Sequence, residues 1–191
     1  MKIEELYKIL LSEKPSELIK QNEDAIFLMI PELKICKGFD QKNIWHVYDV
    51  YEHILHVVDE VDSDLTLRLS ALFHDIGKPV SYVEDSSGVG HFPFHWVESL
   101  KIFDNFASNY KIDPVIVSDV RKLINFHDIN ITKIDGKRLD DFLNAFNTND
   151  LVRKLYNLKR ADLKSQNKQF HYMLSLYDDW EQDTLKLISQ R

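Results

Sequence analysis

The sequence predicts a mainly α-helical protein with one hydrophobic core. Its 191 residues include only five Gly and five Pro, so few positions interrupt regular structure. Apolar residues recur mostly at spacings of three and four, which is the period of an amphipathic helix. A hydrophobic content of 44% is enough for one well-buried domain. We therefore expect an all-α fold in a single domain that spans residues 1–191.

Charge and cysteine content narrow the class of protein. The formal net charge of -7 argues against a broad basic face for duplex DNA or RNA, but it allows a small pocket for a phosphorylated substrate. Cys36 is the one cysteine, so we expect no disulfide framework and no thiolate zinc cluster. The first residues are acidic where a signal peptide is basic, and no apolar run approaches the roughly 20 residues that cross a bilayer. These features predict a soluble cytoplasmic protein without a membrane partner.

The N-terminal part of the chain is expected to form helices on both sides of a loop. Residues 2–12 have an amphipathic pattern, and residues 16–30 fit one or two further helices. The pattern breaks over residues 31–44, where Gly, Asp and Asn are typical of a loop. The next helix is predicted at about 46–61, and its apolar stripe includes His53.

The following helix, predicted over 65–75, is apolar on almost every side, which is typical of a central helix. It ends in the pair His74-Asp75, and Gly77 is expected to stop it. Residues 81–92 then favour a small β-hairpin or an ordered loop.

The second half of the chain continues in helices. Pro93 begins one that carries His95, and Pro114 opens another whose inward stripe reaches His127. The remaining predicted helices are 137–146, a helix from Asn149 whose inward stripe reaches Asp162, and 170–189.

Ionisable side chains thus occupy inward positions that should be apolar. They are His53, His74, His127 and Asp162, with Asp75 directly after His74. Each one alone is explained by a core residue with a hydrogen-bond partner. Together they indicate a metal site, because a divalent cation removes the cost of burying Asp75 and Asp162. A His/Asp set without Cys suits Mn, Fe, Ni, Co, Zn or Mg.

The order His53, His74-Asp75, Asp162 resembles the HD-domain metal-dependent phosphohydrolase superfamily. The resemblance covers about residues 44–165, with 1–43 and 166–191 as helical extensions that pack on this core. Three segments are most similar to the HD domain of bacterial CCA-adding tRNA nucleotidyltransferases: His74 to Pro79, residues 81–92 before His95, and Arg160-Ala161-Asp162. We find no Gly-Ser strand–turn with paired aspartates near the N-terminus, so the nucleotidyltransferase head and its nucleotide addition are not implied.

The resemblance implies an all-α HD-domain helical bundle and one or two divalent metal ions. The implied four-ligand core is His53, His74, Asp75 and Asp162, with Asp75 as the bridge where two metals bind. His95 and His127 match the extra histidines of members with a binuclear site.

Further residues have two readings each. Lys78 matches a lysine whose ammonium meets a substrate phosphate, or it faces solvent after a helix end. Arg160 binds substrate phosphate or forms a surface ion pair. Asp128 and His46 could support the ligands from behind. The aromatic residues Phe92, Phe94 and Trp96 wall a base-binding pocket or pack in the core.

The expected function is metal-dependent hydrolysis of a phosphomonoester or cyclic phosphodiester, with a nucleotide as the substrate by analogy with the family. Asp75 and Lys78 are the expected catalytic residues. Two alternatives stay open at this point: an HD-type di-iron oxygenase on the same ligands, and a regulatory module that binds a nucleotide without hydrolysing it. The oligomeric state also stays open.

Overall fold

The computed structural model describes residues 1–190, and helices make up most of them. The α-helices are α1 (Ile3–Leu10), α2 (Pro15–Gln21), α3 (Glu23–Met29), α4 (Pro31–Cys36), α5 (Val50–Glu60), α6 (Leu65–Phe73), α7 (Lys78–Ser81), α8 (His95–Tyr110), α9 (Pro114–Phe126), α10 (Gly136–Ala145), α11 (Asn149–Lys164) and α12 (Leu174–Ser189). The 3₁₀ helix η1 (Ile131–Lys133) lies between α9 and α10, and the 3₁₀ helix η2 (Lys168–Met173) lies between α11 and α12. The strands β1 (Val83–Glu84) and β2 (Gly90–His91) pair antiparallel. The predicted all-α class, with a small hairpin within 81–92, is confirmed.

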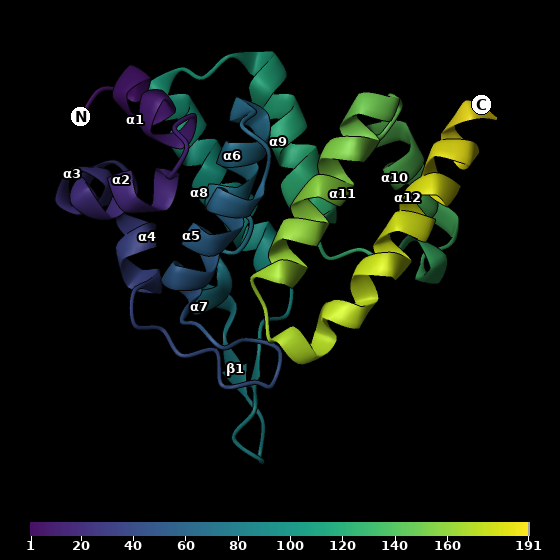
Figure 1. Cartoon of the computed structure of the whole chain (residues 1–191), viewed down its shortest axis with the longest axis horizontal. Coiled ribbons are helices and arrows are strands. Elements are labelled where there is room, and N and C mark those ends of the chain that lie inside the picture. Colours follow the sequence, from purple (N-terminus) through teal and green to yellow (C-terminus); the bar gives the residue numbers. More distant parts are fainter. Residues whose placement is uncertain (191) are drawn as a thin grey trace.

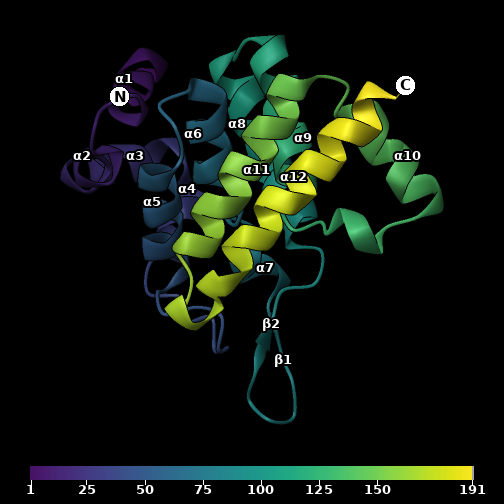
Figure 2. The same ribbon diagram turned by 45° about the vertical axis from the view of Figure 1, so that its right-hand side comes forward.

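Helix α6 is the centre of the bundle. Every residue from Thr66 to Phe73 is buried, and the helix contacts α1, α5, α8, α9 and α11. Helices α1 to α4 lie on one side of α5 and α6, whereas α12 runs along α11 on the other side (Figure 1). The β-hairpin projects beyond the helices, as the second view also shows (Figure 2). Within residues 1–190, no helix is both long and apolar enough to cross a bilayer.

Side-chain caps fix where four of the inner helices begin. The side chains of Asp49, Asp64, Asp113 and Thr148 accept a backbone N–H from the first turn of α5, α6, α9 and α11 respectively. Such caps satisfy N–H groups that have no partner within the helix. A fixed start sets the rotation of each helix, and therefore which residues face the centre.

Three predicted boundaries are wrong, each for a local reason. Helix α5 begins at Val50 rather than 46, because Asp49 caps it and residues 42–48 stay in a loop. The expected loop over 31–44 contains the short helix α4, which Pro31 starts at its first position. The expected helix 170–189 is divided, with η2 before Leu174 and α12 after it.

Gly77 has a different role from the helix stop that the sequence predicts. Its φ of -80 is available to any residue. A Cβ atom at this position would meet the His95 carbonyl oxygen, lie 2.5 Å from the backbone nitrogen of Ser99 and lie 2.8 Å from Cβ of Glu98. The Gly77 N–H donates to Ser99 Oγ at 2.9 Å, and that hydroxyl donates to the His74 carbonyl at 2.8 Å. Gly77 therefore lets α8 pack directly against the chain that follows α6.

We expect Gly77→Ala to lower the free energy of unfolding by about 2–3 kcal/mol, because overpacking a well-filled site forces backbone to move. Urea unfolding followed by circular dichroism measures this change. Gly38→Ala is the matched control: Gly38 has a φ of +76 but open space around its Cα, so it should lose only about 1 kcal/mol through backbone strain. Equal losses at both positions would contradict the packing explanation.

Candidate metal centre

The six candidate ligands come from five helices and meet at one point. His53 lies on α5, His74 and Asp75 follow α6, His95 begins α8, His127 follows α9 and Asp162 lies on α11. Their ligand atoms form two groups, in each of which all atoms lie within 4.8 Å of one another. The first ligand group is His53, His74, Asp75 and Asp162, and the second ligand group is Asp75, His95 and His127.

Asp75 belongs to both groups because its two oxygens face opposite ways. Oδ2 lies 3.2 Å from Nε2 of His53 and 3.3 Å from Nε2 of His74. Oδ1 lies 3.1 Å from Nε2 of His95 and 3.6 Å from Nε2 of His127. Asp162 completes the first group, with Oδ1 at 3.1 Å from Nε2 of His53. One carboxylate therefore has one oxygen in each ligand group.

All four imidazoles share one hydrogen-bonding pattern. Each places Nδ1 against a backbone carbonyl oxygen: His53 on Ser165 at 3.4 Å, His74 on Ala71 at 2.8 Å, His95 on Phe92 at 3.1 Å and His127 on Ile124 at 2.7 Å. A carbonyl only accepts, so Nδ1 carries a proton, and in the neutral ring Nε2 keeps its lone pair. This is the arrangement of a metal-binding histidine whose second nitrogen is anchored by the protein.

These lone pairs point at other acceptors, which tests whether the residues fit a cation. Nε2 of His95 lies 3.1 Å from Nε2 of His127, and the Nε2 atoms of His53 and His74 face carboxylate oxygens. Among residues 1–190, neither of these last two buried atoms has a hydrogen-bond partner. Acceptors so close together repel one another unless positive charge lies between them. The residues therefore fit a divalent cation in each group, and imidazole with carboxylate suits the harder transition metals.

The electrostatics of the first group are those of an anionic site. Burial favours neutral His53, but the carboxylates of Asp162 and Asp75 outweigh it and raise the pKa of His53 to about 9. Burial also acts to raise the pKa of Asp75, whereas His74, Lys78 and other neighbours hold that pKa well below its ordinary value. Both carboxylates are thus ionised near neutral pH, so the site attracts either a proton or a metal cation.

The ammonium of Lys78 makes three polar contacts, one of which is with Asp75. Its ammonium lies 2.6 Å from Asp75 Oδ2, donates to Gln41 Oε1 at 2.9 Å and lies 3.1 Å from His46 Nε2. Nδ1 of His46 faces the Asn43 side-chain oxygen at 2.9 Å. Burial and the charge of Lys78 lower the pKa of His46 to about 2, so its neutral ring accepts from Lys78. The three N–H groups of Lys78 are therefore matched by three acceptors.

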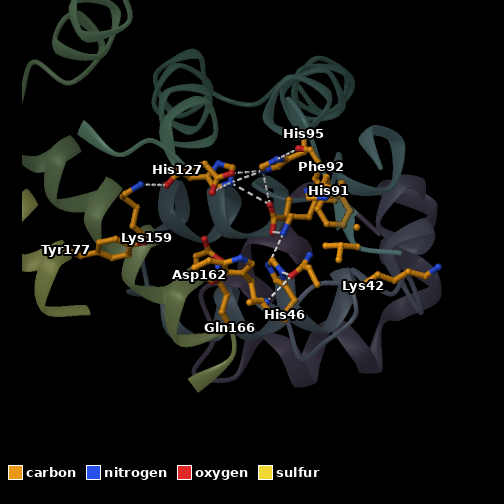
Figure 3. Close-up of a pocket in the computed structure, with 18 residues that line it drawn as sticks. Lys42, His46, His91, Phe92, His95, His127, Lys159, Asp162, Gln166 and Tyr177 are labelled. Atoms are coloured by element: carbon orange, nitrogen blue, oxygen red, sulfur yellow. Dashed lines mark hydrogen bonds and ion pairs between the residues drawn. The ribbon is translucent and has the colours of Figure 1, made fainter. Parts of the chain in front are cut away.

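Four of the six candidate ligands, Asp75, His95, His127 and Asp162, line a cavity of about 910 Å³, whereas His53 and His74 are fully buried and do not line it. Figure 3 shows His95 and His127 on one side of it, with Asp162 and Gln166 opposite. Apolar and aromatic lining comes from Ile44, Trp45, Val89, Phe92 and Tyr177, and the basic or titratable lining outside the ligands from Lys42, His46, Lys78, His91 and Lys159. A mostly apolar pocket with a few convergent polar groups is typical of a small-molecule site.

Trp45 is a rigid part of this wall. Its ring stacks on Phe170 with centroids 3.7 Å apart and planes 24° apart. Its carbonyl accepts from the Asn167 N–H at 2.8 Å, and the Asn167 side chain donates to the Ile44 carbonyl at 3.1 Å. These contacts join the loop 42–48 to the chain that follows α11.

Some expected residues lie elsewhere. Arg160 points away from the cavity lining and pairs with Asp178 at 3.1 Å and Glu181 at 2.7 Å on α12. Phe94 is 66% exposed and Trp96 packs against the core, so of the expected aromatic wall Phe92 alone lines the cavity. Asp128 reaches the second ligand group, with Oδ2 at 3.5 Å from His95 Nε2.

Sequence reasoning missed several residues around the centre. Gln41 and Trp45 lie in a loop without periodicity, so no pattern marks them. Lys159 could have been found, because it lies three residues before Asp162 and therefore on the same side of α11. Gln166 donates to Asp162 Oδ1 at 3.0 Å from just beyond the end of that helix.

Comparison with known proteins agrees with this geometry. The family model for the HD domain matches residues 44–163, a span that contains every candidate ligand. The chain belongs to the HD domain family. The resemblance noted in the sequence is thereby confirmed.

Two curated relatives are longer proteins, of which this chain covers only a part. An A-adding tRNA nucleotidyltransferase of Deinococcus radiodurans is 26% identical over an alignment of 162 positions, and the alignment covers 78% of this chain and 36% of the relative. A multifunctional CCA protein of Janthinobacterium sp. (strain Marseille) is 28% identical over an alignment of 157 positions, and the alignment covers 79% of this chain and 37% of the relative. The chain thus spans little more than a third of the length of these relatives.

We expect Asp75→Ala to abolish metal binding, because it removes the carboxylate that both ligand groups share. Elemental analysis of the purified protein measures metal content, and circular dichroism checks that the helices remain. Asp75→Asn, which keeps an oxygen for Lys78, should behave in the same way if the loss is one of charge. Asp85→Ala, which removes an exposed hairpin carboxylate paired with His91, should keep the wild-type metal content. Full metal retention in both Asp75 variants would reject the site.

A second variant separates the two ligand groups. We expect His127→Ala to lower the metal stoichiometry without emptying the protein, since the four residues of the first group stay in place. A titration of metal-depleted protein with Mn²⁺ measures the number of equivalents bound. A wild-type chain that binds only one equivalent at saturation would contradict the presence of two metal positions.

Proposed function

We propose that this HD domain is a metal-dependent phosphohydrolase that cleaves a phosphomonoester or a cyclic phosphodiester of a nucleotide. The observation that carries the proposal is the position of Asp75, which lines the cavity and whose two oxygens face two separate pairs of histidines. Paired cation sites of this kind suit the in-line displacement of a phosphate ester by water. One relative is named as an A-adding tRNA nucleotidyltransferase and the other as a multifunctional CCA protein, but the chain spans only 36% and 37% of them, so nucleotide addition is not carried over.

The chain's own residues would prepare this reaction. His53, His74, Asp75 and Asp162 would hold one cation, and Asp75, His95 and His127 a second. Divalent cations bound there supply a water of lowered pKa and positive charge for the phosphoryl oxygens. Water adds to phosphorus, the ester bond breaks and the leaving alcohol takes a proton. The burial of His53, His74 and Asp75 excludes bulk solvent from this side of the cavity and strengthens the electrostatic interactions there.

In this proposal Lys78 acts through Asp75 rather than on the substrate. An ammonium with three acceptors has to break one contact before it can bind a phosphate oxygen. Its bond to Asp75 Oδ2 would fix the rotation of the Asp75 carboxylate and so keep one oxygen in each ligand group. Arg160 is not included, because its guanidinium is paired on α12.

The cavity wall supports a substrate with a flat ring. Trp45 offers an aromatic surface that Phe170 backs and Asn167 holds in place, and Phe92 and Tyr177 add further aromatic lining. Nucleobases stack on such surfaces irrespective of base identity, at about 1–3 kcal/mol per base. A nucleoside leaving group would therefore fit beside the ligand groups.

Elemental analysis beside an activity screen tests the proposal. The purified protein should contain a divalent metal, and with added Mn²⁺, Ni²⁺ or Mg²⁺ it should hydrolyse members of a panel of nucleotides, cyclic nucleotides and simple phosphomonoesters. Asp75→Ala should lose this activity. Metal-loaded protein that hydrolyses none of the panel would reject hydrolysis in favour of a regulatory nucleotide-binding module. Oxygen uptake with bound iron would identify an oxygenase instead.

Trp45→Ala tests the aromatic wall. We expect it to lower kcat/KM for a mononucleotide by about tenfold or more, because it removes a stacking surface worth about 1–3 kcal/mol. The rate on glycerol phosphate, which has no ring, should change little. Trp45→Phe is the matched control, since it keeps an aromatic face and should stay close to wild type. Equal losses on both substrates would mean that Trp45 supports the fold and not the leaving group.

A further inference from the structure

Lys159 is a buried cation in the middle of α11 that belongs to neither ligand group. Its side chain lies along Tyr177 of α12, and its ammonium points to the chain that follows α9 (Figure 3). Only 5% of the residue is exposed. Burying an ammonium is costly unless its hydrogen bonds are replaced, so its partners indicate what it does.

These partners are two backbone carbonyls at the end of α9. The Lys159 ammonium donates to the carbonyl oxygen of His127 and, at 2.7 Å, to that of Ile129. Both carbonyls lie beyond Phe126, the last residue of α9, so they have no partner within that helix and need a donor from elsewhere. Lys159 therefore ties down the turn from His127 to Ile129.

His127 depends on that turn for its direction. It caps the C-terminal end of α9. Nδ1 of its ring donates to the Ile124 carbonyl at 2.7 Å, whereas Nε2 faces Asp75 and His95. The backbone on its C-terminal side is held by Lys159. The ring of His127 is thus anchored from within its own helix, and its backbone from α11.

The same helix carries a ligand of the other group. Asp162 follows Lys159 by three residues, so both side chains lie on one side of α11. Because α11 supplies Asp162 to the first ligand group and grips the backbone of His127 in the second, it sets the position of one group relative to the other.

We propose that Lys159 is a positioning residue for the second metal position, acting through the backbone of His127. This inference rests on the two metal positions of the proposed function but not on hydrolysis. Loss of a residue that orients a metal ligand costs about 10- to 100-fold in metal affinity. Removal of Lys159 should therefore weaken the second equivalent by that factor and leave the first unchanged.

Titration of the metal-depleted full chain with Mn²⁺ tests this, with free Mn²⁺ read from its electron paramagnetic resonance signal. Lys159→Met should bind the first equivalent like wild type and the second about 10- to 100-fold more weakly. Lys159→Arg should bind the second equivalent with an affinity close to that of wild type, because a guanidinium can donate to both carbonyls. Lys164→Met is the matched control: Lys164 lies on the same helix, is exposed, and pairs with Glu60 at 3.4 Å, so both equivalents should bind as in wild type.

Lys159→Gln keeps an uncharged N–H donor group on a shorter side chain, and it covers the case in which Lys159→Met does not fold. It should lie between the Arg and Met variants in affinity for the second equivalent. Wild-type affinity for both equivalents in Lys159→Met or Lys159→Gln would overturn the inference, and so would equal weakening of both. A wild-type protein that binds two equivalents but hydrolyses nothing would reject the proposed hydrolysis while leaving this titration to decide the role of Lys159.

Discussion

The repulsion among buried acceptors at the centre of the bundle is the constraint on which the rest of the structure depends. Four imidazoles and two carboxylates converge there. Acceptor atoms packed this closely repel one another unless positive charge lies between them. Backbone carbonyls hold each ring from behind through Nδ1. Three of the four carbonyls lie three residues before the histidine they hold, so the orientation of these rings is set within one turn of chain.

The helices supply what such local anchors cannot, which is the distance between rings. Capped starts of α5, α6, α9 and α11 fix the rotation of each helix about its axis. Gly77 allows α8 to approach the end of α6 more closely than any side chain would permit. His74 and His95 are brought together by this contact, because Ser99 of α8 bonds to both the Gly77 N–H and the His74 carbonyl.

The sequence was sufficient to predict the helical class and the convergence of the six candidate ligands, because both follow from periodicity. A histidine three residues from one core position and four from another has to face inward, and such reasoning works for His53 and His127. It fails for Gln41 and Trp45, whose loop has no repeat and whose partners, such as Asn167, are remote in the chain. It also misassigned Pro31–Cys36, because a six-residue helix is too short to show a period.

The division of labour between helices and loops has an evolutionary consequence. Every candidate ligand lies on a helix or just after its end. By contrast, the cavity-lining residues Lys42, Trp45, His91 and Phe92 lie in the loop 42–48 or in and after the hairpin. Loops accept substitutions and insertions more readily than packed helices do. Substitutions in these loops can therefore change the shape of the cavity in small steps during evolution. The buried helices and the candidate ligands that they carry can stay the same.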